Sequence, residues 1–240
     1  MPENEKPPAR PEDNYYKTGD ENMYGEDKYE LKAFVENEEF LIWTDLLIKY
    51  EFAIEEISTK INILNNEFKL LHDYNPIEHI KTRVKKPKSI VQKLISKGLD
   101  PTPENITDNI KDIAGVRIIC SFTEDIYLIF NILSKQDDVN VIEVKDYIKN
   151  PKENGYRSLH AIVTIPVFLS TGTVNVPVEI QIRTIAMDFW ASLEHKIYYK
   201  YRNKTLNHIS DELKECADMI TILDNKMVDI RKEIEKLPEN

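Results

Sequence analysis

Several features that would place the chain in a large class of proteins are scarce or missing. Only two cysteines occur among its 240 residues, Cys120 in an apolar run and Cys216 in a helical pattern, and they form no metal-binding spacing. No apolar run approaches the roughly 20 residues that a membrane-spanning helix needs. The N-terminus has no apolar segment of the signal-peptide type. We therefore expect two isolated, buried thiols and a cytoplasmic protein with no membrane partner.

Acidic residues are absent from one segment of a chain that is acidic overall. The formal net charge is −10, which disfavours binding to RNA or to an anionic membrane. Between His79 and Leu99, however, no Asp or Glu occurs, whereas seven lysines and arginines do. A concentrated positive patch on an acidic protein indicates a small polyanion as the ligand. The alternative, a solvated basic helix face, is common and stays open.

A short helix is predicted within this basic segment, from Ser89 to Ile95, with Gly98 as its stop. Arg83 and Lys85 precede it in what should be an extended stretch. Ser89 is placed either to cap the helix or to turn its hydroxyl toward a phosphate at the helix N-terminus. Capping is the more common outcome.

A second cationic segment, KDYIKNPKENGYRSLH, runs from Lys145 to His160. It carries five basic side chains and Tyr156, and its centre, residues 150–155, is rich in turn-forming residues. Apolar β-type residues flank it, which predicts a loop between two strands. Cations beside an aromatic ring suit a nucleotide, because phosphates need positive charge and a base needs a surface on which to stack. A solvated surface loop explains this stretch equally well.

The hydrophobic periodicity predicts an α+β fold. Apolar residues at spacings of three and four indicate a long helix from Phe34 to about Leu71 and another helix or helix pair from Leu206 to Ile234. Between them, strand patterns alternate with helical ones; the strands are expected at 115–122, 139–144, 159–167 and 176–184, and the helices at 89–95, 125–135 and 186–200. We expect a mixed sheet of about five strands flanked by helices, with long N- and C-terminal helices.

Three segments are expected along the chain. Residues 1–30 are polar and proline-bearing, which predicts a flexible tail. Residues 31–203 form the main domain together with its N-terminal helix. Residues 204–240 form a C-terminal amphipathic segment, whose apolar stripe must pack against something and which we assign to oligomerisation.

The last expected strand has the clearest alternation. Its apolar residues Val178, Ile180 and Ile182 face one way, and its polar residues face the other; these are Glu179, Gln181 and Arg183. Burying an acid, an amide and a base without partners is costly. This row is therefore either an exposed sheet face or the floor of a polar site, and the sequence favours the site.

Four collinear stretches together resemble the small alarmone synthetases, the stand-alone relatives of the RelA/SpoT enzymes. The stretches are HIKTRVKKPKSIVQK (79–93), DIAGVRIIC (112–120), YIKNPKENGYRSLH (147–160) and VEIQIRTIAMDFWASLEHK (178–196). The resemblance implies a nucleotidyltransferase-like synthetase domain that transfers the pyrophosphate of ATP to the 3′-hydroxyl of GDP or GTP, or GMP, and releases AMP. It covers about residues 40–230.

The resemblance also implies roles for individual residues. Glu179 would be the general base, and Asp112 and Glu179 would hold Mg²⁺. The residues assigned to ATP are Arg83, Lys85, Ser89, Lys93 and Arg117, and Arg83 and Arg117 would sandwich the adenine. Tyr156 would stack on the guanine. The other residues assigned to the GDP or GTP site are Lys145, Lys152, Asn154, His160 and Gln181.

Partners and regulation follow from the same resemblance. Many relatives form homotetramers, some bind pppGpp in a central cleft as an activator, and some bind single-stranded RNA, which the net charge disfavours here. Asp188 and Lys81 depart from the residues expected at their positions, and an acidic residue in such a cleft would disfavour a bound polyphosphate.

Two other classes of function compete with a pyrophosphotransferase. A nucleotide or RNA sensor without turnover would be expected to have lost Asp112 or Glu179, and both are present. An ordinary ATP phosphotransferase or nucleotidyltransferase is the other alternative. The sequence contains neither a GxxxxGK[ST] motif nor a kinase GxGxxG loop.

Overall fold

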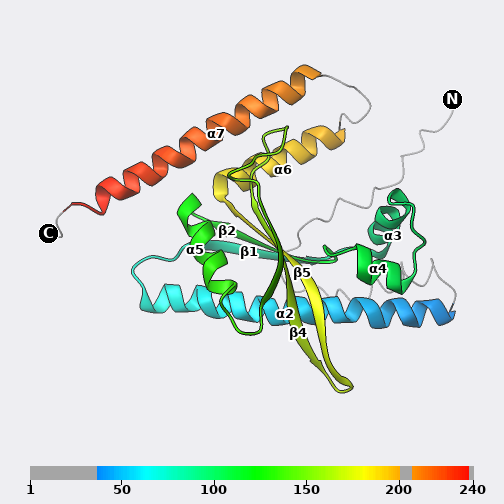
Figure 1. Ribbon diagram of the computed structural model, residues 1–240. Helices are drawn as coiled ribbons and strands as arrows, with labels where there is room; N and C mark the ends of the chain where they lie inside the picture. The colour runs from blue at the N-terminus through cyan, green and yellow to red at the C-terminus, as the bar shows by residue number, and fades with distance from the viewer. Residues whose placement is uncertain (1–36, 201–206, 238–240) are drawn as a thin grey trace, which may run out of the picture.

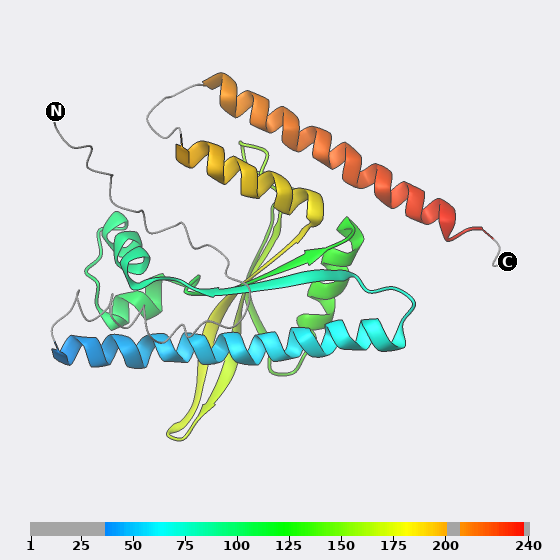
Figure 2. The same cartoon turned by 180° about the vertical axis from the view of Figure 1, so that it is seen from behind.

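The computed structural model of the protein describes residues 37–200 and 207–237 (Figures 1 and 2). Within them the chain forms six helices and five strands. In chain order these are α2 (Asn37–Leu71), β1 (Ile77–Val84), α3 (Pro87–Ser96), α4 (Pro103–Asn109), β2 (Ala114–Cys120), α5 (Thr123–Leu133), β3 (Asn140–Asp146), β4 (Leu159–Leu169), β5 (Gly172–Thr184), α6 (Ile185–Lys200) and α7 (Asn207–Ile234). The expected tail, residues 1–30, lies outside the described residues.

The strands form one mixed sheet in the order β1–β2–β5–β4–β3. β2 and β5 run parallel, and the other three neighbouring pairs are antiparallel. The predicted fold class, a sheet of about five strands flanked by helices with long helices at both ends, is confirmed.

One face of the sheet is apolar and packs against α2. The alternation read in the sequence is present on β5, where Val178, Ile180 and Ile182 are buried in the core. From the facing helix, Ile57 and Ile61 are fully buried, and α2 runs the length of the molecule along this side of the sheet (Figure 1). Burial of each such side chain stabilises the fold by about 1.5–3 kcal/mol. The opposite face of the sheet carries mainly polar side chains.

Helices α6 and α7 lie side by side on the other side of the molecule from α2, as both views show (Figures 1 and 2). The indole nitrogen of Trp190 on α6 donates a hydrogen bond of 2.8 Å to the carbonyl oxygen of Leu213 on α7. No helix among the described residues is both long and apolar enough to cross a membrane.

Two local predictions are corrected, and two elements are added to those expected from the sequence. Ser89 does not cap α3, because that helix begins at Pro87 and its N-cap is Lys86. Residues 77–84 form a full strand, where the sequence indicated only an extended stretch. Helix α4 was not predicted, although Thr102 caps it by accepting a hydrogen bond from the Asn105 amide at 3.2 Å. Cys120 is buried as expected, but Cys216 is exposed.

Candidate active site

Strand pairing arranges the polar face of the sheet in two rows that cross all five strands. Residues paired in register on neighbouring strands point to the same face, so positions that lie far apart in the sequence become neighbours. The first row, in sheet order, is Lys81, Arg117, Gln181, His160 and Lys145; the second is Arg83, Gly115, Glu179, Ile162 and Glu143. Glu179 thus lies at the centre of the sheet, with cations toward both edges.

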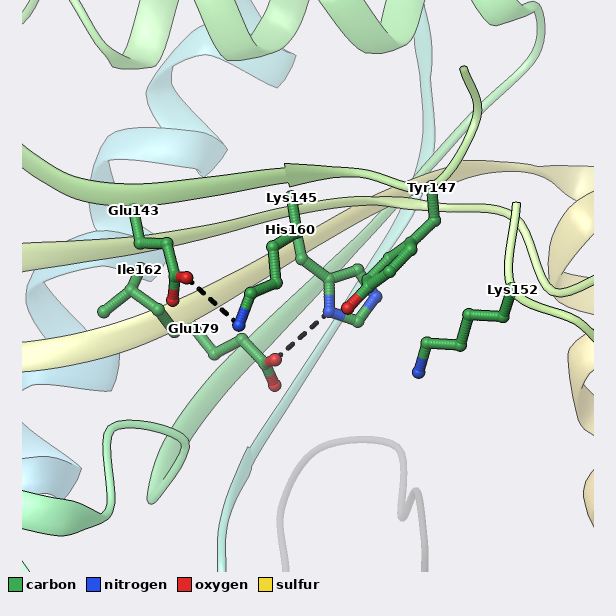
Figure 3. Close-up of a pocket in the computed structure, with 7 residues that line it drawn as sticks. All are labelled: Glu143, Lys145, Tyr147, Lys152, His160, Ile162 and Glu179. Atoms are coloured by element: carbon green, nitrogen blue, oxygen red, sulfur yellow. Dashed lines mark hydrogen bonds and ion pairs between the residues drawn. The ribbon is translucent and has the colours of Figure 1, made fainter. Parts of the chain in front are cut away.

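A pocket opens over the β3–β4–β5 half of this face (Figure 3). Its lining contains four of the predicted site residues, Lys145, Lys152, His160 and Glu179, together with three that were not predicted, Glu143, Tyr147 and Ile162. The Lys152 ammonium lies 4.8 Å from the centre of the Tyr147 ring and 4.9 Å from that of Tyr156. The pocket therefore combines positive charge with aromatic surface, as the 145–160 segment predicts.

The carboxylate of Glu179 is held by two hydrogen bonds in the pocket floor. His160 Nδ1 lies 3.2 Å from Oε1, and Gln181 Nε2 donates to Oε2 at 2.9 Å. Burial works against ionisation of Glu179, and repulsion from Asp112 acts in the same direction. The hydrogen bonds from His160 and Gln181 outweigh them and hold its pKa below the usual value. Glu179 is therefore ionised at neutral pH and able to accept a proton.

A chain of hydrogen bonds links this carboxylate to Tyr156. Because a carboxylate can only accept, the proton of the His160 ring lies on Nδ1, and Nε2 accepts from the Tyr156 hydroxyl at 2.8 Å. Arg183 donates to the same hydroxyl oxygen at 2.8 Å. Burial raises the pKa of Tyr156 despite the nearby positive charge of Arg183. The tyrosine is thus neutral and fixed in orientation.

Arg183 and Asp188 are site residues that the predicted set left out. Arg183 is only 2% exposed. Its guanidinium also donates to Gln181 Oε1 at 2.9 Å and to Asp188 Oδ1 at 3.2 Å, and that same oxygen accepts from Arg117 at 3.2 Å. The sequence placed Arg183 on the polar face, but its partner Asp188 comes from α6. The carboxylate of Asp188 thereby joins the two arginines on β2 and β5.

Asp112 lies before β2 and forms ion pairs with two lysines from the basic segment. Its Oδ2 accepts from Lys85 at 2.7 Å and from Lys93 at 2.6 Å. Burial opposes the ionisation of Asp112, but the charges and hydrogen bonds of the two lysines outweigh it and lower its pKa to about 2. Burial in turn lowers the pKa of Lys85.

The donor set around Asp112 fits a divalent cation that takes most of its ligands from phosphates and water. The second oxygen, Oδ1, is buried without a hydrogen-bond partner, and a buried carboxylate oxygen of this kind is a ligand that Mg²⁺ accepts. Among the described residues no cluster of three or more His, Cys, Asp or Glu could hold a metal by itself. Any cation here would need the substrate as a co-ligand, with Glu179 as the second carboxylate.

Comparison with known proteins identifies the family. Residues 82–204 match the family model described as the region found in RelA/SpoT proteins. The chain is 50% identical over 206 residues to GTP pyrophosphokinase YwaC of Bacillus subtilis, an alignment that spans 86% of this chain and 96% of the relative. The chain belongs to the RelA/SpoT family.

Solved structures place the chain among the small members of the RelA/SpoT family. The crystal structure of small alarmone synthetase 2 from Bacillus subtilis is 51% identical, with a TM-score of 0.73 over 80% of this chain and 98% of that one. Small alarmone synthetase 1 from the same organism, bound to its product pppGpp, is 36% identical, with a TM-score of 0.75 over the same shares of the two chains. The resemblance inferred from the four motifs is confirmed.

The residues that the RelA/SpoT resemblance implied are only partly brought together. Arg83 lies beside Gly115 in the row of Glu179, with its Cγ 3.7 Å from where a Cβ would lie on that glycine. Ser89 is a half-buried residue in the first turn of α3. The Asn154 side chain donates to Glu194 on α6 at 3.2 Å and accepts from the Tyr156 amide at 3.2 Å. Asn154 thus shapes the loop in this structure.

Proposed function

We propose that this protein is a cytoplasmic (p)ppGpp synthetase, which transfers the β,γ-pyrophosphate of ATP to the 3′-hydroxyl of GDP or GTP and releases AMP. The observation that carries the proposal is the position of Glu179. It lies at the centre of the polar sheet face, between a basic side built from β1, α3 and β2 and an aromatic, cationic side built around the β3–β4 loop. Such a layout suits two nucleotides that meet at one carboxylate. The pppGpp found on the related synthetase supports the same reaction.

The basic side is assigned to ATP. Lys85 and Lys93 converge on Asp112 and would neutralise the polyphosphate, while Ser89 lies in the first turn of α3, where backbone amides favour anions. Arg83 and Arg117 come from adjacent strands and are assigned to the adenine ring. A planar guanidinium is suited to stacking on a base.

The aromatic side is assigned to the guanine nucleotide. Tyr156 offers a ring for the base, and Lys152 lies over that ring at 4.9 Å. Lys145 and His160 line the same pocket toward Glu179 (Figure 3). Gln181 and Asn154 complete the assigned set, the first beside Glu179 and the second in the turn of the loop.

The reaction needs one proton transfer and one displacement at phosphorus. The 3′-oxygen of the acceptor forms a bond to the β-phosphorus of ATP, and its proton passes to the carboxylate of Glu179. The bond between the β-phosphorus and the oxygen that bridges it to the α-phosphorus breaks, and AMP leaves with that oxygen. Magnesium, held by Asp112 Oδ1 and Glu179, would supply charge neutralisation on the phosphates and lower the pKa of the hydroxyl.

The C-terminal helix bears on how the protein assembles. We expect the homotetramer that the family resemblance implies. The outer face of α7 supports self-association because it exposes large apolar side chains; they are Met219, Ile222, Leu223, Met227, Ile230 and Ile234. Single-stranded RNA is not a favoured partner, given the net charge of −10.

One assay separates this function from its alternatives. Purified protein would be incubated with Mg²⁺, γ-labelled ATP and GMP, GDP or GTP, and the products separated by ion exchange. We expect the label in a more highly charged guanosine nucleotide, with AMP as the co-product. ADP as the co-product would indicate simple phosphoryl transfer instead, and tight nucleotide binding without turnover would indicate a sensor.

A further inference from the structure

The loop that carries Tyr156 packs directly on the C-terminal helix. The loop, residues 147–158 between β3 and β4, extends alongside α6 to reach α7 (Figures 1 and 2). Gly155 has a φ of +88°, and a Cβ placed on it would lie 2.6 Å from the Cβ of Ala217 and 3.4 Å from the Cα of Lys214. Such a separation is shorter than any ordinary contact, so only glycine allows the loop backbone to lie this close to α7.

An ion pair holds the same turn of the loop against α7. One guanidinium nitrogen of Arg157 lies 3.3 Å from Asp218 Oδ1, and the other donates to the Gly155 carbonyl at 3.2 Å. Arg157 therefore clamps Gly155 to the helix turn that contains Ala217. Tyr156 lies between these two residues, so the two contacts together hold its backbone against α7.

Helix α7 is itself anchored to the core of the domain. Thr184, the residue after Arg183 on β5, donates to the buried carboxylate of Asp224 at 2.7 Å. Farther along, Arg231 pairs with the buried Asp125 at 3.3 Å and lies 4.3 Å from the centre of the Tyr74 ring. The strand that presents Glu179 and the loop that presents Tyr156 are thus tied to one rigid helix.

We propose that Ala217 and Asp218 are positioning residues, and that α7 sets where the guanine nucleotide lies relative to Glu179. This inference rests on the proposed function and deepens it. The residues assigned to ATP lie mainly on β1 and α3, and α3 lies apart from α7 in both views (Figures 1 and 2). A change at the contact between α7 and the loop should therefore alter the binding of the guanine nucleotide and leave the binding of ATP unchanged.

Two substitutions on α7 test the inference while leaving the sequence of the loop unchanged. Ala217→Leu adds bulk where the loop backbone already meets the helix, and we expect it to raise the KM for GDP or GTP at least tenfold. Asp218→Asn removes a partly exposed ion pair and should raise that KM about threefold, with Asp218→Glu restoring it. The KM for ATP should stay within twofold in all three variants. The matched controls are Cys216→Leu and Asp211→Asn, at exposed positions on the same helix.

Hydrogen exchange provides a readout that does not depend on turnover. The loop holds internal backbone hydrogen bonds, from the Gly155 amide to the Lys152 carbonyl at 2.8 Å and from the Lys152 amide to the Tyr156 carbonyl at 3.2 Å. Residues 152–158 should exchange several times faster in Ala217→Leu and Asp218→Asn, while α3 is unchanged.

The outcomes separate the two proposals. If the wild type transfers no pyrophosphate, the proposed function fails, and loop exchange still decides whether α7 positions the loop. If the wild type is active but the folded variants keep the acceptor KM within twofold, the inference is overturned. An equal rise in the KM of both substrates would also overturn it, since that indicates general destabilisation. Should Ala217→Leu not fold, Asp218→Asn decides.

Discussion

Replacing Glu179 by glutamine keeps the shape of the side chain and removes its ability to take a proton. In the structure both carboxylate oxygens are engaged, one by His160 and one by Gln181. A glutamine oxygen can still accept from one of these partners, so the fold should survive. The reaction should not, because the proton of the acceptor hydroxyl then has no base at this position.

The size of the loss follows from what a positioned base contributes. Proton transfer by such a group accounts for about 10²–10⁴ in rate, which corresponds to roughly 3–5 kcal/mol of activation free energy. We expect kcat to fall by that factor in Glu179→Gln. The KM for ATP should change less than kcat, since the Asp112, Lys85 and Lys93 contacts of the basic side are left unaltered by this substitution. Because the pKa of Glu179 in the free protein is lowered, the acid limb of the wild-type kcat/KM profile that belongs to this group should lie below the ordinary pKa of a glutamate.

The measurement is the steady-state transfer of label from γ-labelled ATP to GTP, with each substrate varied in turn. Glu143→Gln is the matched control, because this residue lines the same pocket and pairs with Lys145 at 3.1 Å. Its kcat should stay within about threefold of the wild type. A Glu179→Gln variant that retains the wild-type kcat would remove the base assignment.

Three further predictions follow from the other contacts of the site. Asp112→Asn should reduce the free energy of unfolding by about 2–3 kcal/mol at pH 7, since the folded pKa of about 2 lies below the usual 3.8. This stabilisation is present above pH 4 and is lost as the pH falls toward 2. Urea titrations should therefore show a larger loss at pH 7 than at pH 3, and an equal loss at both would contradict the prediction. Tyr156→Ala should raise the KM for GTP about tenfold or more, as loss of a stacked ring costs about 1–3 kcal/mol, whereas Tyr156→Phe should keep most of the affinity; equal effects of the two would exclude stacking. Asp188→Ala should destabilise the protein by about 3 kcal/mol, because Arg183 is buried and would lose a charged partner; thermal unfolding measures it, and Asp211→Ala, on the exposed face of α7, serves as the control.

Most helices and strands of the fold could be predicted from the spacing of their apolar residues, because each has one buried face. Apolar residues at spacings of three and four located α2, and strict alternation on β5 identified which side of the strand is buried. The element that the sequence did not predict is a short helix. Helix α4 spans only seven residues, so its sequence carries too little periodicity to stand out, even though Thr102 caps it and Pro103 begins it.

The site was predictable where a single segment carries the chemistry, and less so where two segments meet. Glu179 and Gln181 are neighbours on one strand, and the alternation alone placed them together. Arg183 lies on the same side of that strand, but its importance depends on Asp188 from α6 and on the Tyr156 hydroxyl. No spacing in the sequence records those contacts. The row that joins Lys81 to Gln181 likewise exists only through strand pairing.

Helix α7 carries its apolar stripe on the face that does not pack on the domain, as the assignment of this segment to oligomerisation requires. The apolar stripe in the sequence includes Leu223, Met227, Ile230 and Ile234, and all four are exposed here. The face that packs on the domain is smaller and more polar; it comprises Leu213, Ala217, Thr221, Asp224, Val228 and Arg231. Burial of a small residue gives close approach, and burial of a polar one requires a specific partner. The inner face therefore fixes the loop of Tyr156, while the outer stripe remains available to a second copy of the chain, so assembly through α7 would bear directly on the helix that holds the acceptor site.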